Sequence, residues 1–145
     1  MIYMTLVRSV ALAGAATWTT SAEDQRLLET WDANLVRQIL GVSVRDRIKT
    51  KVLRGRLRID KSMSREVADA RIRLFGHVAR MDGEQRALRT LMDGAMKRLG
   101  GDKKGRPKKS WMQCVTRDLE NRGIGVFSAM KLAIDRNRFR SQIVM

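Results

Sequence analysis

The chain has 145 residues, of which 43% are hydrophobic, so it is long enough for one domain with a modest core. Thirty Lys and Arg residues oppose fifteen Asp and Glu residues, which gives a formal net charge of +15. One cysteine and one histidine exclude a disulfide framework and a zinc finger, and they favour a reducing compartment. Residues 1–44 carry only three of the basic residues and four of the acidic ones. The charge therefore predicts a neutral anchoring part followed by a part that binds polyanions.

Residues 2–15 predict a first helix that breaks near Gly14. The apolar run in this segment is also similar to a secretory signal peptide, but Arg8 divides it and no basic residue precedes it. No stretch of the chain is apolar for long enough to cross a bilayer. We therefore expect a packed helix, in a nuclear or cytoplasmic protein that is neither secreted nor membrane-spanning and has no membrane partner.

The next predicted helix follows Thr20 or Ser21, since Ser21 with Asp24 approximates a capping box, and it ends at Gly41. Spacings of three and four place its apolar residues on one stripe, which consists of Leu27, Leu28, Trp31, Leu35, Ile39 and Leu40.

Residues 45–58 predict a short amphipathic helix followed by a bend near Gly55. Ile48, Val52, Leu53 and Leu57 lie between the charges. The cations of this segment are Arg45, Arg47, Lys49, Lys51, Arg54, Arg56 and Arg58. They bind phosphates, or they form the solvated face of a helix, and the sequence leaves both interpretations open.

A longer helix is predicted from Ser64 to about Met81. Its packed face consists of Val67, Arg71, Leu74, Phe75, Val78 and Met81, with Ile72 at the edge. Gly76 weakens a helix by about 1 kcal/mol relative to alanine, so we expect a neighbouring helix to approach closely there. We interpret His77 as a packing residue, because no partner is placed by sequence to use it.

A further helix is predicted at about residues 84–98, and Gly100-Gly101 then opens a basic linker. The linker places five cations around Pro107, and these are Lys103, Lys104, Arg106, Lys108 and Lys109. Charges this dense cannot be buried, so they form a solvated arm that suits a row of phosphates. Gly105-Arg106-Pro107 is similar to the core of an AT-hook, which enters the minor groove of DNA. A nuclear-import patch and a linker without a partner are the alternatives.

Ser110 with Gln113 predicts a capping box for a helix whose apolar face includes Trp111, Val115 and Leu119, with Cys114 nearby. Gly123 and Gly125 close this helix. A last helix is predicted from Ser128 to Phe139, and it carries Arg136, Arg138 and Arg140.

Catalytic patterns are scarce in this sequence. It has no phosphate-binding glycine loop and no paired carboxylates suited to two-metal phosphoryl transfer. A Cys114–His77 pair is the one conceivable catalytic dyad, and we favour a packing cysteine instead. The sequence therefore predicts no catalytic residue, no metal, no cofactor and no small-molecule substrate.

Six segments, in chain order, resemble the C-terminal part of non-LTR (LINE-type) retrotransposon reverse transcriptases. Ala13–Thr19 resembles the family's "YGSETWT", Leu35–Val42 resembles "LRRILGI", and Arg45–Arg47 resembles the "RDR" that follows. Arg71–Met81 resembles "RRLRWLGHVLRM", with Phe75 in the place of tryptophan or leucine. Gly105–Val115 resembles "GRPRKRWxDCV", and Asp135–Arg140 resembles "QDRSRWR".

The resemblance implies the thumb and basic C-terminal extension of an RNA-directed DNA polymerase, the part expected to hold the primer–template duplex. The family's "YADD"-type catalytic motif has no counterpart here, so we expect no polymerisation by this chain alone. In the intact polymerase the first two helices would pack on the palm. Association through exposed Trp18, Leu28, Trp31 and Leu35 is therefore an alternative use of that surface.

Together these features predict a mainly α protein, a small irregular bundle of about five to seven helices with a flexible basic linker near 100–109. We expect a thumb-like region at 1–99, the linker at 100–109 and a helical extension at 110–145. The predicted function is DNA or RNA binding through phosphates. The alternatives are a basic interaction protein, an AT-hook-like DNA-binding protein and a truncated copy without function.

Overall fold

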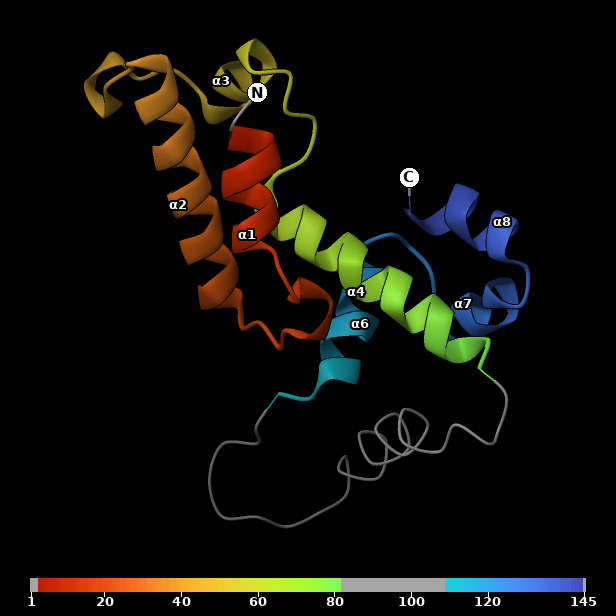
Figure 1. The fold of residues 1–145 in the computed structure, drawn as a ribbon. Coiled ribbons are helices and arrows are strands. Elements are labelled where there is room, and N and C mark those ends of the chain that lie inside the picture. The colour runs from red at the N-terminus through yellow and green to blue at the C-terminus, as the bar shows by residue number, and fades with distance from the viewer. Residues whose placement is uncertain (1–2, 82–108, 145) are drawn as a thin grey trace, which may run out of the picture. The chain divides into compact units, whose positions relative to one another are not determined.

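The computed structural model of the protein describes residues 3–81 and 109–144. Within these residues all regular structure is helical and no strand is formed (Figure 1). The mainly α class expected from the sequence is therefore confirmed. The helix predicted at 84–98 lies outside the described residues.

The described residues fall into two compact units, each with its own buried core. Unit one is built from the described residues within 1–13 and 20–67, and unit two from those within 14–19 and 68–145. The boundary falls inside helix α4 (Met63–Ala79), after Val67. The sequence predicted a thumb-like region at 1–99, a linker at 100–109 and an extension at 110–145, and of the linker only Lys109 is described.

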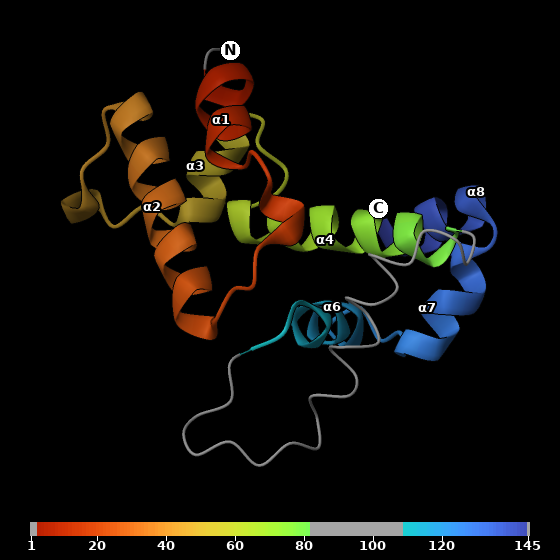
Figure 2. The ribbon, with the colours of Figure 1, turned by 60° about the horizontal axis from the view of Figure 1, so that its bottom comes forward.

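Unit one contains η1 (Tyr3–Arg8), α1 (Ser9–Ala11), α2 (Ala22–Leu40), η3 (Val44–Asp46), α3 (Thr50–Arg56) and the start of α4. Helix α1 lies beside α2 in both views (Figures 1 and 2). The buried core of this unit consists of Tyr3, Val36, Leu53, Leu57, Ile59 and Met63.

The first segment packs as a helix and breaks at Gly14, which has a φ of 69°. Arg8, which interrupts the apolar run, is a buried anchor and only 2% exposed. Its Nη2 donates to the Lys61 carbonyl oxygen at 3.0 Å and lies 3.2 Å from the Glu66 carboxylate. A guanidinium that is paired in this way can be buried within an apolar segment.

Helix α2 begins and ends as predicted. The Ser21 hydroxyl accepts from the Asp24 N–H at 3.0 Å, and the Asp24 carboxylate accepts from the Ser21 N–H at 2.7 Å. Gly41 ends the helix with a φ of 64°, in the left-handed region that glycine adopts without strain.

The apolar stripe predicted on α2 is confirmed only in part, since Leu35 and Leu40 pack against the core of unit one but half of the stripe is exposed. Leu27 and Trp31 are 63% and 43% exposed, and Ile39 is 46% exposed. Asp32 and Val36 are instead fully buried. The reason is that the centre of the buried face is a carboxylate with partners on two other elements, and apolar periodicity does not count such a residue.

Unit two contains η2 (Ala15–Thr17), the rest of α4, α6 (Trp111–Glu120), α7 (Val126–Ala133), α8 (Arg136–Phe139) and η5 (Arg140–Val144). Its buried core consists of Ile72, Phe75, Met112, Val115, Leu119, Ala129, Ala133, Phe139 and Ile143. The Ser110–Gln113 capping box of α6 is formed as predicted.

A buried ion pair joins α4 to α6. The Arg71 Nη2 and Nε atoms each lie 2.7 Å from an oxygen of Asp118, and both side chains are almost wholly buried. Arg71 Nη1 also donates to the Trp18 carbonyl oxygen at 3.2 Å, and Trp111 Nε1 donates to the Ala16 carbonyl oxygen at 2.7 Å. These two bonds tie residues 14–19 to unit two.

The single helix predicted from Ser128 to Phe139 is wrong, because the structure forms two helices there. Helix α7 ends at Ala133, and Asp135 caps α8 by accepting from the Asn137 and Arg138 N–H groups at 2.9 and 3.1 Å. An aspartate that takes backbone donors starts a new helix rather than continuing one. Ile134, at the break, is 79% exposed.

Gly76 allows the close approach that the sequence predicted. A Cβ atom built on Gly76 would lie 2.9 Å from both Cδ1 and Cζ of Phe139, and closer still to Cε1. The ring of Phe139 therefore occupies the space that any other residue at position 76 would fill, and α8 packs directly on α4.

Candidate nucleic-acid interface

The predicted cationic segment of unit one begins with a tight turn. The Ser43 hydroxyl accepts from the Arg45 N–H at 3.2 Å, and the Asp46 carboxylate accepts from the Ser43 N–H at 2.7 Å. Arg47 then adopts a left-handed φ of 51°. This local geometry leaves the side chains of Arg45 and Arg47 exposed.

Helix α3 follows, with its apolar side in the core and its cations outside. Leu53 is fully buried and Leu57 is 7% exposed. Arg37 of α2 reaches across to this segment, where its Nη2 donates to the Ile48 carbonyl oxygen at 3.5 Å and to the Thr50 hydroxyl at 3.4 Å. The segment is therefore held to α2 by both packing and hydrogen bonds.

Six of the seven predicted cations in this segment are exposed. We call them the 45–58 cationic surface, and they are Arg45, Arg47, Lys49, Lys51, Arg56 and Arg58. The predicted bend near Gly55 falls inside the last turn of α3, and Arg58, with a φ of 54°, comes after the helix end.

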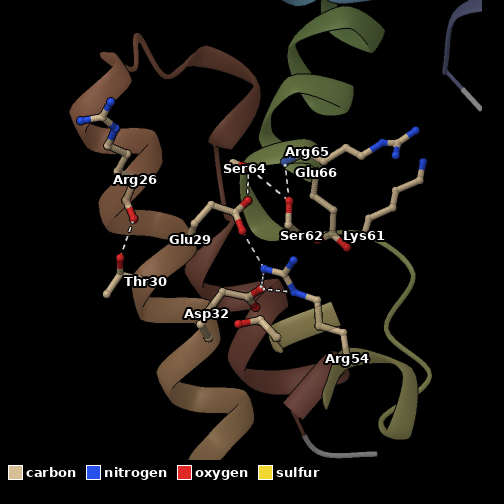
Figure 3. A network of polar contacts seen from close by, with 12 residues as sticks. Arg26, Glu29, Thr30, Asp32, Arg54, Lys61, Ser62, Ser64, Arg65 and Glu66 are labelled. Carbon is tan, nitrogen blue, oxygen red and sulfur yellow. Dashed lines mark hydrogen bonds and ion pairs between the residues drawn. The ribbon is translucent and has the colours of Figure 1, made fainter. Parts of the chain in front are cut away.

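Arg54, the seventh predicted cation, is engaged with carboxylates of α2 (Figure 3). Its Nη2 lies 2.6 Å from Asp32 Oδ2 and 2.7 Å from Glu29 Oε2, and its Nε donates to Asp32 Oδ2 at 3.0 Å. Asp32 also accepts a 2.6 Å hydrogen bond from the Tyr3 hydroxyl, and Glu29 accepts one from the Ser64 hydroxyl. Arg54 therefore positions α3 rather than adding to the exposed charge.

The protonation equilibria of this network reflect its burial. Burial and the hydrogen bond to Asp32 raise the pKa of Tyr3 above its ordinary value. Burial alone would raise the pKa of Glu29, but hydrogen bonds from Ser62, Ser64 and Arg54 outweigh it and hold that pKa below its ordinary value. Burial likewise opposes the charged form of Arg54, and its two carboxylate partners outweigh that effect and raise its pKa.

The second predicted site, the basic linker, is described at one residue. Lys109 is exposed and directly precedes the capping residue Ser110. The other predicted cations of the linker lie outside the described residues, and they are Lys103, Lys104, Arg106 and Lys108.

A cluster of arginines that the sequence did not single out lies in unit two. The four arginines, Arg73, Arg80, Arg136 and Arg140, line a hollow of about 600 Å³ together with His77 and Phe139. The sequence does hold a weak signal, since positions 73, 77 and 80 share a helical face and positions 136 and 140 share another. Their convergence depends on the packing of Phe139 against Gly76, which spacing alone does not reveal.

The packing role predicted for His77 is wrong. His77 is exposed and lines this hollow, because the neighbouring positions 75, 76 and 78 take up the buried face of α4. Cys114 is 1% exposed within unit two, as expected for a packing cysteine.

Comparisons with protein-family models, with curated proteins and with solved structures give no match. None of the helices in residues 3–81 and 109–144 is long and apolar enough to cross a membrane. In the same residues, no group of three or more His, Cys, Asp or Glu side chains is placed to hold a metal ion.

Proposed function

We propose that this chain binds DNA or RNA through phosphate contacts, as the nucleic-acid-holding C-terminal part of a mobile-element reverse transcriptase. The observation that carries the proposal is the 45–58 cationic surface, in which six cations are exposed on one short, firmly held segment. The resemblance of six ordered sequence segments to LINE-type reverse transcriptases supports the proposed origin.

Two carboxylates of unit one, Glu29 and Asp32, also support the proposal. Glu29 and Asp32 are directed at Arg54 inside unit one, so they do not neutralise the exposed cations. These two carboxylates of unit one therefore stabilise its fold and are not directed at the 45–58 cationic surface. Clustered exposed cations attract phosphates and release the counterions condensed on nucleic acid.

The test compares two double variants with the same change in charge. Lys51→Ala/Arg56→Ala removes two cations of the 45–58 cationic surface, whereas Arg26→Ala/Arg65→Ala removes two exposed arginines of α2 and α4. Binding to a short generic duplex is measured by fluorescence anisotropy at several salt concentrations. We expect the first variant to lower the magnitude of the log–log salt slope by about 2, since each phosphate contact contributes about 0.9.

The control variant should change the slope far less. Equal losses in the two variants would contradict the assignment of the interface to residues 45–58. A loss confined to particular duplex sequences would also contradict it, because phosphate contacts carry no sequence information.

A further inference from the structure

The charged residues that line the hollow in unit two come from two helical segments. Arg73 and His77 come from α4, Arg80 directly follows its last residue, and Arg136 and Arg140 come from α8 and the start of η5. Spacings of four and three from Arg73 to Arg80, and of four on the C-terminal segment, place the members of each set on the same side of the chain. In both views α8 lies by the C-terminal end of α4 (Figures 1 and 2).

The contact between Gly76 and Phe139 explains why so many cations meet. The missing side chain at position 76 lets the Phe139 ring pack on the α4 backbone. Phe139 is 3% exposed and belongs to the core of unit two. The hollow therefore has an apolar residue from the core and a cationic rim.

The nearby hydrogen bonds leave this rim positively charged. Arg80 Nη1 donates to the Ala133 carbonyl oxygen at 2.9 Å, which is a neutral acceptor. None of the described residues that line the hollow is acidic. Asp135, next to Arg136 in sequence, caps α8 with its carboxylate.

Charge and size together define the kind of ligand. Concave surfaces lined by one sign of charge focus the field and raise the local concentration of counterions. Guanidinium groups match phosphate oxygens in bidentate geometry, which favours phosphates over neutral ligands. A volume of about 600 Å³ lies within the range of small-molecule sites and suits more than one phosphate group.

From these features we infer that the hollow lined by Arg73, Arg80, Arg136 and Arg140 is a phosphate-binding site for two or more adjacent phosphate groups. A nucleic-acid strand and a free polyphosphate both present this chemistry. Binding of a nucleic-acid strand in the hollow rests on the proposed function. Binding of a free polyphosphate there does not depend on it.

The experiment uses the full chain and a control matched in position and charge. Arg73→Ala/Arg140→Ala removes one hollow arginine from α4 and one from the C-terminal segment. Arg65→Ala/Arg138→Ala removes one exposed arginine from each of the same regions, and neither of these lines the hollow. Figure 3 shows the Arg65 side chain directed away from the Glu29–Arg54 network, so its loss should not disturb folding.

Two arms separate the sources of phosphate. In the first, anisotropy with a labelled single-stranded oligonucleotide should show binding weakened about tenfold by Arg73→Ala/Arg140→Ala. The salt slope should fall in magnitude by about 1.4, since each contact on a single strand contributes about 0.7. In the second, sodium tripolyphosphate is titrated at constant ionic strength, and arginine Nε–Hε resonances should shift in the wild type and the control but not in this variant.

A selective loss in the oligonucleotide arm identifies the ligand as a strand. A selective loss in the tripolyphosphate arm alone identifies a free polyphosphate, and this result stands even if the 45–58 cationic surface binds no nucleic acid. Equal behaviour of the two double variants in both arms overturns the inference, and it leaves the test of the 45–58 cationic surface unaffected. Circular dichroism spectra that match the wild type confirm that both variants are folded.

Discussion

A methyl group added at Gly76 would collide with the ring of Phe139, whereas one added at Gly55 would meet no atom within 4 Å. These two helical glycines therefore isolate the role of close packing at a single residue. We expect Gly76→Ala to destabilise the protein, because overpacking costs about 1–3 kcal/mol and exceeds the gain of about 1 kcal/mol in helix propensity. Gly55→Ala should gain up to about 1 kcal/mol instead.

Urea unfolding followed by circular dichroism measures both free energies. If Gly76→Ala proves as stable as Gly55→Ala, α8 does not pack on α4 as described. The same substitution should also disturb the arginine hollow, since the hollow depends on this contact.

Buried guanidiniums show how far single residues can depart from a hydropathy pattern. Arg8 and Arg71 are among the fully buried side chains, and each is neutralised by a carboxylate from a distant segment. The sequence placed Arg71 on the packed face of its helix but gave no means of choosing Asp118 as its partner. Pairings over such separations follow from tertiary packing, which local spacing does not encode.

At the scale of elements, the network of Tyr3, Asp32, Arg54 and Glu29 joins η1, α2 and α3. The pKa of Tyr3 is raised from its ordinary value of 10.0, so the folded state keeps the phenol proton longer than the unfolded state does. Its contribution to stability is complete below pH 10 and is lost as the pH rises above that value. We therefore expect the free energy of unfolding to decline on the alkaline side, and Tyr3→Phe to remove this part of the decline.

At acidic pH the free energy of unfolding depends on pH in the opposite direction, because of Glu29. The pKa of Glu29 lies below its ordinary value of 4.5, so its contribution to stability is present above pH 4.5 and is lost as the pH falls through the folded-state value.

Because Tyr3 is the only tyrosine, tyrosinate absorbance reports its ionisation directly. Ionisation of Tyr3 near pH 10 in the folded chain would contradict the buried hydrogen bond to Asp32.

Helix ends were more predictable than helix faces. The capping boxes at Ser21 and Ser110 and the glycine stop at Gly41 are local hydrogen-bond patterns, so the sequence specified them. The buried face of α2 was not predicted, because its central residue is Asp32. The break at Asp135 was also missed, since a capping aspartate inside an apolar pattern is ambiguous until the backbone is known.

The candidate site was likewise predictable in part from the sequence. Exposure of the 45–58 cations was predictable from their density, but the diversion of Arg54 to Asp32 required knowledge of how α2 and α3 pair. The arginine hollow was missed because its two rows of residues are some sixty positions apart in sequence and meet only where Phe139 packs on Gly76.

At the scale of the whole molecule, the net charge of +15 provides a general attraction to polyanions, and the two units each present cations in a distinct arrangement. Unit one offers exposed cations on a turn and a short helix, and unit two offers a hollow. Exposed Leu27 and Trp31 on α2 also leave apolar surface on unit one. We therefore assign binding to these two arrangements of cations rather than to net charge alone.

Binding through phosphates is measured by the affinity of the full chain for a generic duplex as a function of salt concentration. With about six phosphates contacted, the plot of log affinity against log salt should be linear with a slope near −5. A slope near zero, or no binding to oligonucleotides in dilute buffer, would contradict the proposal that this protein holds nucleic acid through its phosphates.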